Sequence, residues 1–584
     1  MARGLGIGRT ADFRRRLLSL AVAMTAGLSV IAASAGDAPI TIVDLQPDRL
    51  VVRAEIRRGP DEIGSASLTN LNPHINSWFL LTLDWPASGE HQSLHLENLD
   101  SQKSLILAAN PDGSLRLEVG GPSNPCQFKL GRGSAPGTFE EARKSGLPYV
   151  PLCDGRLYLR NPVVGRATRL EMVTDFLRSH VWGGERFVSL VKKEAYRDKF
   201  LEQAAPQSNG RSVAASNEAP APADRDATRT SLAIMPPDLG IEIDGQTQSM
   251  VEGEWYAVRD LADVFVSVMA PGTIAPTILH DRNPNVSELG SVESAALVYL
   301  VAFELERFDL RYELGTEHPR LGWSPRPPAS AQDPRIAGPD GIDTAAPLAR
   351  TGMVSPALAS RTVATFAGGF KRDHGAFRYG PLAERNHGSH YGFVEEGVTF
   401  STLQPGLATV WTTPTGGVQL QTWTSPDRAL VSGIRDARQN GVPLIEYDAS
   451  QQKSSPGAWV NRWGEGNWSG SANEDLRTVR AGLCLQEAHG HRFLIYGYFS
   501  DATPSAMARI FQAYGCRYAM QLDMNALEHT YLALYVVRGE ERVVEHLIEG
   551  MAVLDQQSHG ELAPRFLSFP DDRDFFYLTR GGSP

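Results

Sequence analysis

Apolar positions follow regular spacings most clearly between residues 476 and 535, where the pattern predicts strand, turn, strand, helix, strand, turn and strand. The apolar run Ala481–Gln486 is followed by a turn at His489–His491 and by a second run, Phe493–Tyr498. We therefore expect a β-hairpin at this point of the chain.

A helix with clear ends follows the hairpin. Thr503 suits the N-cap, Pro504 the first helical position and Gly515 a left-handed C-terminal position. Apolar residues recur on one face at three- and four-residue spacing: Met507, Ile510, Phe511 and Tyr514. The next strand, Arg517–Leu522, leads directly to Asp523. A carboxylate at the carboxyl end of a strand is a common position for site residues.

The first 35 residues have the features of an export signal. Arg14–Arg16 precede an apolar run, Leu17–Ala33, and Ala33-Ser34-Ala35 is a small-residue cleavage sequence. The alternative is an uncleaved membrane anchor, but the run is shorter than the ~20 residues that a spanning helix needs. We expect an exported protein, periplasmic or extracellular, with no transmembrane span after this segment.

Charge argues against one class of partner. The formal net charge is −11, and removing the first 35 residues makes the rest more acidic, because it removes five arginines and one aspartate. We therefore expect no nucleic-acid partner.

The chain has four cysteines, which in an exported protein suggest two disulfides. We expect Cys126 to pair with Cys153 and Cys484 with Cys516, since each pair lies within one predicted domain. Metal-binding thiols are the alternative, although no Cys-x-x-Cys spacing occurs.

Composition divides the remaining chain into an amino-terminal domain, a linker and a larger domain. Residues 38–202 combine short alternating strands with two predicted helices, Arg166–His180 and Glu185–Gln203, which favours a mixed α+β domain. Residues 203–230 are rich in Ala, Pro, Ser and Asn, and we interpret them as a disordered linker. A second α+β domain then occupies residues 231–584.

Several segments of this second domain, with a core at about 295–537, resemble the phosphodiester glycosidase family. The strand Thr362–Lys371 (TVATFAGGFK) matches a family strand that ends in Asn-Gly-Gly-Phe, with Ala367 in the place of the Asn. The element order around Asp523 is also similar, although the family turn Asp-Gly-Gly-Gly-Ser is here Asp-Met-Asn-Ala-Leu. The resemblance implies an α+β fold and hydrolysis of the bond between a sugar and a phosphate.

The resemblance and the nearby polar residues give candidate site residues. The catalytic candidates are Asp523, Glu528 and His529, and the substrate-binding candidates are Gly368, Gly369, Arg372, His374, Arg477 and Arg480. Cations suit a phosphate and carboxylates suit the anomeric centre. Arg477 and Arg480 both fit the family's arginine. The alternatives are that residues 371–390 form a solvated surface loop, and that Asp523 only caps backbone amides.

We therefore expect an exported hydrolase acting on a sugar-1-phosphodiester in an envelope or secreted glycan. The alternative is a catalytically degenerate glycan- or envelope-binding protein on the same fold, with tryptophans that stack on sugars: Trp411, Trp423, Trp459, Trp463 and Trp468. We expect no cofactor. The need for a metal stays open, because His387 and His390 have a ligand spacing without a third ligand in register.

Overall fold

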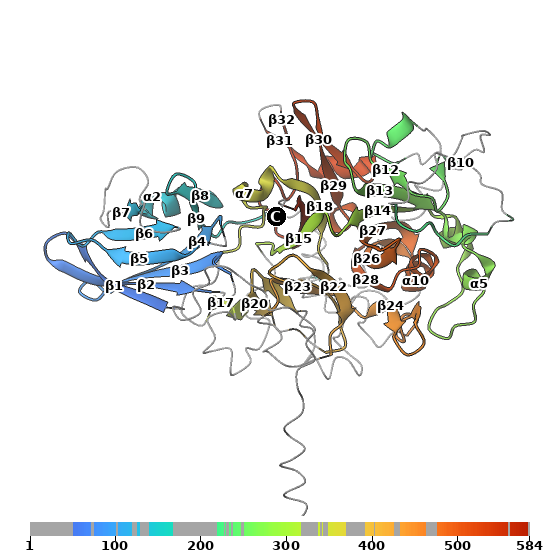
Figure 1. The fold of residues 1–584 in the computed structure, drawn as a ribbon, viewed down its shortest axis with the longest axis horizontal. Helices are drawn as coiled ribbons and strands as arrows, with labels where there is room; N and C mark the ends of the chain where they lie inside the picture. The colour runs from blue at the N-terminus through green and yellow to red at the C-terminus, as the bar shows by residue number, and fades with distance from the viewer. Residues whose placement is uncertain are drawn as a thin grey trace, which may run out of the picture. The chain divides into compact units, whose positions relative to one another are not determined.

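The computed structural model describes residues 51–581, with its longest gaps at residues 167–180, 182–218, 317–336, 370–391 and 463–475. Antiparallel sheets dominate the described residues, and each of their paired strands is antiparallel (Figure 1). The expected α+β fold class is therefore wrong, and the fold is β-rich.

The amino-terminal part contains a six-stranded and a three-stranded sheet. The first has the order β1 (Val51–Arg58), β2 (Glu62–Asn70), β3 (Trp78–Trp85), β4 (Glu90–Asn98), β9 (Leu157–Arg160) and β8 (Tyr149–Leu152). The second has the order β5 (Leu105–Ala109), β6 (Leu115–Val119) and β7 (Cys126–Phe128). Leucines and aromatic residues from both sheets form one buried cluster, which the short helix α2 (Phe139–Lys144) completes with Phe139.

The largest sheet has eight strands. Their order is β12 (Tyr256–Ala257), β13 (Val264–Met269), β14 (Val298–Glu304), β27 (His491–Ala502), β26 (Thr478–Ala488), β28 (Tyr518–Met524), β24 (Pro443–Asp448) and β25 (Lys453–Pro456). The predicted hairpin is confirmed between β26 and β27. His489 and Gly490 form its turn, and both have positive φ (54° and 85°), as a two-residue turn matched to strand twist requires.

A five-stranded sheet packs on one face of the eight-stranded sheet. Its order is β15 (Phe308–Glu313), β33 (Phe575–Arg580), β18 (Thr362–Ala367), β29 (Leu532–Arg538) and β30 (Glu541–His546). The Phe366 ring lies 5.2 Å from the Tyr496 ring of the larger sheet and 5.4 Å from the Phe576 ring of its own sheet, between ring centroids. One continuous apolar core therefore joins these two sheets.

A third sheet of this region has the order β20 (Val398–Ser401), β19 (Phe393–Glu395), β23 (Asp436–Gln439), β21 (Ala408–Thr412) and β22 (Val418–Thr422). Its central strand β23 is wholly buried and carries the charged residues Asp436 and Arg438. Buried charges need partners, and the partner of Arg438 belongs to the candidate site described below.

Helix α10 (Pro504–Ala513) is the predicted helix, and its capping is confirmed: Thr503 Oγ1 accepts a hydrogen bond from the Ala506 amide at 3.2 Å. The helix lies against β27 and β28 (Figure 1). It contacts the sheet at the paired residues Gly482 and Gly497, where an added Cβ would come within 3.0 and 3.3 Å of the Phe511 ring. The absence of side chains there lets the helix pack closely on the strands.

The described helices are too short to support the predicted α+β class. The longest helix among the described residues is α10, with ten residues. The two helices predicted within residues 166–203 lie almost wholly outside the described residues, and α2 has only six residues. Short strands joined by tight turns instead build the sheets.

The end of the predicted linker is packed where the structure describes it. Ala219 and Ala223 are buried, and the Ala221 amide donates to Gln486 Oε1 at 2.9 Å. Most of residues 203–230 lies outside the described residues, so the domain boundary stays a prediction.

Both predicted disulfides are confirmed: Cys126–Cys153 joins β7 to the turn after β8, and Cys484–Cys516 joins β26 to the turn after α10, three residues beyond the end of the helix. Two disulfides are compatible with an oxidising, exported environment. Within the part of the chain that the structure describes, no helix is both long enough and apolar enough to span a bilayer.

Candidate functional site

Asp523 lies near the carboxyl end of β28, beside a bulge. Arg480 of β26 pairs with Met524, whereas Gly482, two residues on, pairs with Gln521, so β28 contains one extra residue. A bulge changes the direction in which a side chain points. Here the side chains of Gln521 and Met524 both contact Arg480, whereas the Asp523 carboxylate binds Arg573, from the segment before β33.

The Asp523 carboxylate is buried and held on both oxygens. Arg573 Nη1 lies 2.5 Å from Asp523 Oδ2, and the Met524 amide donates to Asp523 Oδ1 at 2.7 Å. A buried, charge-assisted pair of this kind fixes a carboxylate in one orientation.

The turn after Asp523 contains a residue in the left-handed region of backbone conformation. This residue is Asn525, with φ +83°. Asn is among the few residues that tolerate this left-handed region. Its amide donates to Val479 O at 2.8 Å, so the turn keeps its attachment to β26 without a glycine.

His529 lies beside Asp523, in a short 3-10 helix, Leu527–His529. Its Nδ1 is 2.7 Å from Met524 O and 3.9 Å from Asp523 Oδ1. A carbonyl oxygen only accepts hydrogen bonds, so Nδ1 carries the proton. Glu528 is buried, and its backbone oxygen accepts a hydrogen bond from Arg565 at 2.6 Å.

Gly368 and Gly369, directly after β18, lie against a second buried ion pair. Arg438 Nε of β23 donates to Asp574 Oδ2 at 2.8 Å, and neither side chain is exposed. An added Cβ at Gly368 would lie 2.2 Å from Asp574 Oδ2, and one at Gly369 would lie 2.8 Å from Arg438 Nη2. The paired glycines are therefore needed for close approach of the backbone to this pair.

Asn440 connects the two ion pairs. Its Nδ2 donates to the backbone oxygens of Gln521 (2.8 Å) and Leu522, the residues just before Asp523. Its Cγ would lie 3.2 Å from a Cβ at Gly369. Segments that follow β18 and β23, the end of β28 and the segment before β33 thus meet in one cluster.

We call this set the Asp523 cluster. Its members are Gly368, Gly369, Arg438, Asn440, Asp523, His529, Arg573 and Asp574.

Sequence reasoning missed the segment before β33, which supplies Arg573 and Asp574. Asp571 receives two hydrogen bonds from Arg565, at 2.7 and 3.2 Å, and one from the Arg573 amide at 2.9 Å. The available signal was four successive charged residues, 571–574, immediately before the apolar strand Phe575–Arg580. Charges at the entry to a buried strand need buried partners.

The two predicted arginines of β26 occupy different environments. Arg480 is fully buried and donates to Ala502 O (2.8 Å), Leu476 O (2.9 Å) and Gln521 Oε1 (2.8 Å). Burial lowers its pKa to about 9. The hydrogen bonds from the Arg480 guanidinium to Gln521 and Met524 thus hold the end of β28 in place.

Arg477 is more exposed than Arg480 and pairs with Asp501 at 3.4 Å. Among the described residues, no contact links Arg477 to the Asp523 cluster. Arg372 and His374 lie outside the described residues.

The candidate sugar-stacking tryptophans are partly in the core. Trp423 is buried with Val394 and Leu403, and Trp411 packs against the same cluster. Trp459 packs against the main core, whereas Trp463 and Trp468 lie outside the described residues.

An open cleft of about 550 Å³ lies near the start of β28, at the opposite end of the strand from Asp523. Polar and aromatic side chains line it, among them Gln419, Gln421, Glu446, Tyr447, Arg517 and Tyr518. The Arg517 guanidinium stacks 4.1 Å from the Tyr447 ring centroid, and Thr422 donates to Glu446 at 2.5 Å. This mixture of aromatic faces, carboxylate and amides suits a polar ligand.

Comparison with known proteins gives only distant structural matches. No family model matches the chain, and no curated protein matches it. The catalytic domain of zebrafish N-acetylglucosamine-1-phosphodiester alpha-N-acetylglucosaminidase, auto-inhibited by its pro-peptide, matches 56% of this chain and 85% of its own, with 10% identity and a TM-score of 0.28.

Two further solved structures are similarly distant. A putative exported protein from Burkholderia pseudomallei matches 49% of this chain and 74% of its own, with 12% identity and a TM-score of 0.20. A hypothetical protein from Synechocystis matches 91% and 97%, with 10% identity and a TM-score of 0.23. These values carry no argument about activity, so the function is argued from the residues of the chain.

Proposed function

We propose that the chain is an exported hydrolase that cleaves the glycosidic bond of a sugar-1-phosphodiester. The observation that carries the proposal is the Asp523 cluster, in which Gly368, Gly369 and Asp523, three of the residues selected from sequence, come together with two arginines. The same cluster holds carboxylates and cations, which are the groups that this reaction needs.

The chemistry of the substrate explains this combination. In the reaction, water adds to the anomeric carbon, the bond from that carbon to the phosphate oxygen breaks, and a phosphate monoester leaves with the bonding electrons. A phosphate monoester has a second pKa near ~6, so its departure depends less on a proton donor than the departure of an alcohol does. Arginines that stabilise the developing negative charge are accordingly more important.

We assign the roles as follows. Asp523 acts on the sugar side, either as the base that activates water or by stabilising the positive charge that develops at the anomeric carbon. We assign phosphate binding to Arg573, whose guanidinium lies 2.5 Å from the Asp523 carboxylate. His529 Nδ1 donates to Met524 O, so we assign any proton transfer by this ring to Nε2.

A second candidate function is glycan binding without catalysis, and the cleft beside Tyr447 and Tyr518 favours it. In the Asp523 cluster the charged groups bind one another, and the Arg438–Asp574 pair has no exposed surface. A binding protein would use the open cleft and retain the cluster for stability.

The test is release of free sugar from a panel of sugar-1-phosphodiesters, comparing the wild type with Asp523→Asn. Asp448→Asn is the matched control, because Asp448 is an exposed residue at the end of β24. We expect turnover of at least one substrate, unchanged in the control and reduced ~10²–10⁴-fold in Asp523→Asn. Folded wild-type protein without turnover across the panel supports glycan binding instead.

A further inference from the structure

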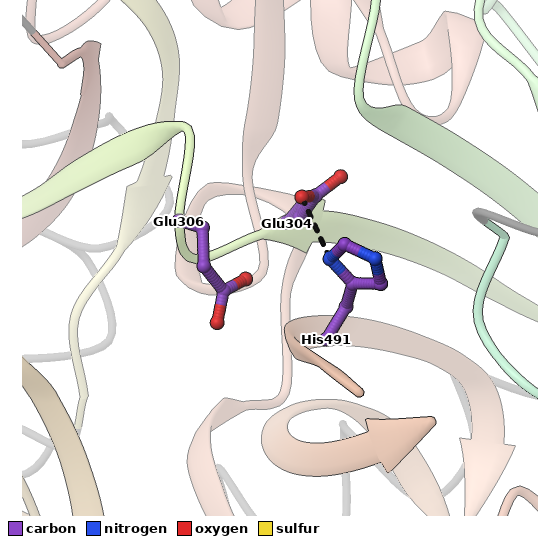
Figure 2. Close-up of side chains that lie close together, drawn as sticks. All are labelled: Glu304, Glu306 and His491. Carbon is purple, nitrogen blue, oxygen red and sulfur yellow. Dashed lines mark ion pairs between the residues drawn. The ribbon is translucent and has the colours of Figure 1, made fainter. Parts of the chain in front are cut away.

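Three potential metal ligands lie together at the end of the eight-stranded sheet opposite Asp523. Glu304 ends β14, Glu306 belongs to the turn between β14 and β15, and His491 begins β27 (Figure 2). One ligand atom from each of these residues lies within 4.8 Å of the others. The register explains the convergence, because Glu304 pairs with Phe493, two residues after His491.

The buried ligand of this group is already held in position. The Glu304 side chain is only 4% exposed, and its Oε1 lies 3.1 Å from His491 Nδ1. The exposed Glu306 accepts a weak hydrogen bond from the Arg492 amide at 3.3 Å. Two of the ligands are thus already in contact, and the third is exposed and held by one long hydrogen bond.

Electrostatics around Glu304 favour an added cation. The Glu304 carboxylate is buried and lies beside the Glu306 carboxylate. Arg307 lies 3.6 Å from Glu304 and is 60% exposed, so it can move into solvent. A metal ion between the carboxylates would offset both the burial and the repulsion between like charges.

We propose that Glu304, Glu306 and His491 bind a divalent transition-metal ion, with Zn²⁺ as the best fit. One imidazole and two carboxylates are ligands that Zn²⁺ accepts, with water in a fourth position, whereas Ca²⁺ and Mg²⁺ prefer oxygen ligands alone. Ligand distances of ~2.0–2.1 Å place tetrahedral ligand atoms roughly 3.4 Å apart, close to the 3.1 Å between Glu304 and His491. Rotation of Glu306 completes the set.

The ion would fasten the β14–β15 turn to the β26–β27 turn and stabilise the folded chain by mass action. The site and the Asp523 cluster lie at opposite ends of β26: Ala488 pairs with His491 at one end, and Arg480 pairs with Met524 at the other. Metal binding here therefore does not depend on the proposed hydrolase activity.

The experiment is calorimetric titration of the untagged full chain with ZnCl₂, together with thermal unfolding with and without Zn²⁺. The hairpin offers a matched pair of histidines, because His489 belongs to the same turn but not to the cluster. His491→Asn and His489→Asn are compared, since Asn tolerates the positive φ of position 489. Glu306→Gln adds a second test at an exposed side chain that folding does not require.

We expect the wild type and His489→Asn to bind one more Zn²⁺ than His491→Asn, and Glu306→Gln to bind it at least tenfold more weakly. Zn²⁺ that binds to other histidines contributes equally to each of these proteins, so it does not affect the differences between them. Equal Zn²⁺ binding by wild type, His491→Asn and Glu306→Gln overturns the proposal, as does a loss in His489→Asn equal to that in His491→Asn.

Discussion

Arg438 Nε donates to Asp574 Oδ2 at 2.8 Å, across 136 residues of sequence and without solvent exposure of either side chain. The pair joins β23 of one sheet to the segment that enters β33 of another. Gly368 and Gly369 lie against it because a Cβ at either position would meet one of its members. This pair thus sets the geometry on one side of the Asp523 cluster.

Removing Arg438 should strongly destabilise the protein. Arg438→Met leaves Asp574 as a buried charge without this partner, which typically costs about 3–5 kcal/mol. The free energy of unfolding in urea measures the loss. Lys144→Gln is the control, because Lys144 forms an exposed pair with Glu140, and such pairs contribute about 0–1 kcal/mol. Equal losses in the two variants would contradict the role given to the buried pair.

A methyl group at position 369 should disturb the cluster. In Gly369→Ala the new Cβ would lie 2.8 Å from Arg438 Nη2 and 3.2 Å from Asn440 Cγ. Overpacking of this kind costs about 1–3 kcal/mol, and we expect turnover to fall with stability. Gly581→Ala is the control, because its nearest neighbour, Arg307 O, is 3.4 Å away. Unchanged turnover and stability in Gly369→Ala would show that this contact is unimportant.

A buried acidic group should make stability depend on pH. Arg160 lies 2.7 Å from Glu313 and 3.3 Å from Glu395, and burial raises the pKa of Glu395 from 4.5 to about 7. The folded state therefore binds more protons than the unfolded state between these values, so stability falls as pH rises through this range. The fall attributable to Glu395 is up to about 3 kcal/mol.

Urea unfolding at pH 5 and pH 8 measures this dependence. Glu395→Gln cannot ionise, so we expect a smaller fall between the two pH values than in the wild type. Glu55→Gln, at an exposed position, should behave as the wild type does. A fall in stability from pH 5 to pH 8 that is as large in Glu395→Gln as in the wild type would refute the assignment.

The Cys484–Cys516 disulfide should support the region that presents Asp523. It closes a loop with a sequence separation of 32 residues, for which loss of the cross-link costs about 3–4 kcal/mol in the chain-entropy account. We expect the double variant Cys484→Ala/Cys516→Ala to lose stability and turnover together. The corresponding Cys126/Cys153 variant should lose stability with little change in turnover. Full activity in the Cys484→Ala/Cys516→Ala variant would show that this disulfide is not needed to position Asp523.

Local signals in the sequence were sufficient for the hairpin and α10. The turn at His489–His491 and the Thr503 cap follow from residue types and short spacings, and the two disulfides follow from the place of each cysteine pair within one predicted domain. The fold class did not follow from them, because one well-capped helix gives no information about how many antiparallel pairs the remaining strands form.

The candidate site could be predicted only in part. Asp523 and the paired glycines come at the ends of strands with clear apolar patterns, so the sequence alone could indicate them as candidate site residues. Arg438 and Asp574 meet across 136 residues, and no local pattern indicates which buried arginine reaches which carboxylate. The conformation of Asn525 was likewise not predictable from local sequence. Its φ is positive in a turn whose amide bonds to Val479 O of β26, a strand that is distant in sequence.

Turnover of a sugar-1-phosphodiester in ¹⁸O-labelled water distinguishes cleavage between the anomeric carbon and the phosphate oxygen from cleavage at phosphorus. The label is read by mass spectrometry in the phosphate product, because the anomeric oxygen of a free sugar itself exchanges with water. We expect an unlabelled phosphate monoester from the wild type and ~10²–10⁴-fold less product from Asp523→Asn. Phosphate that carries ¹⁸O would show cleavage at phosphorus and would contradict the proposed reaction.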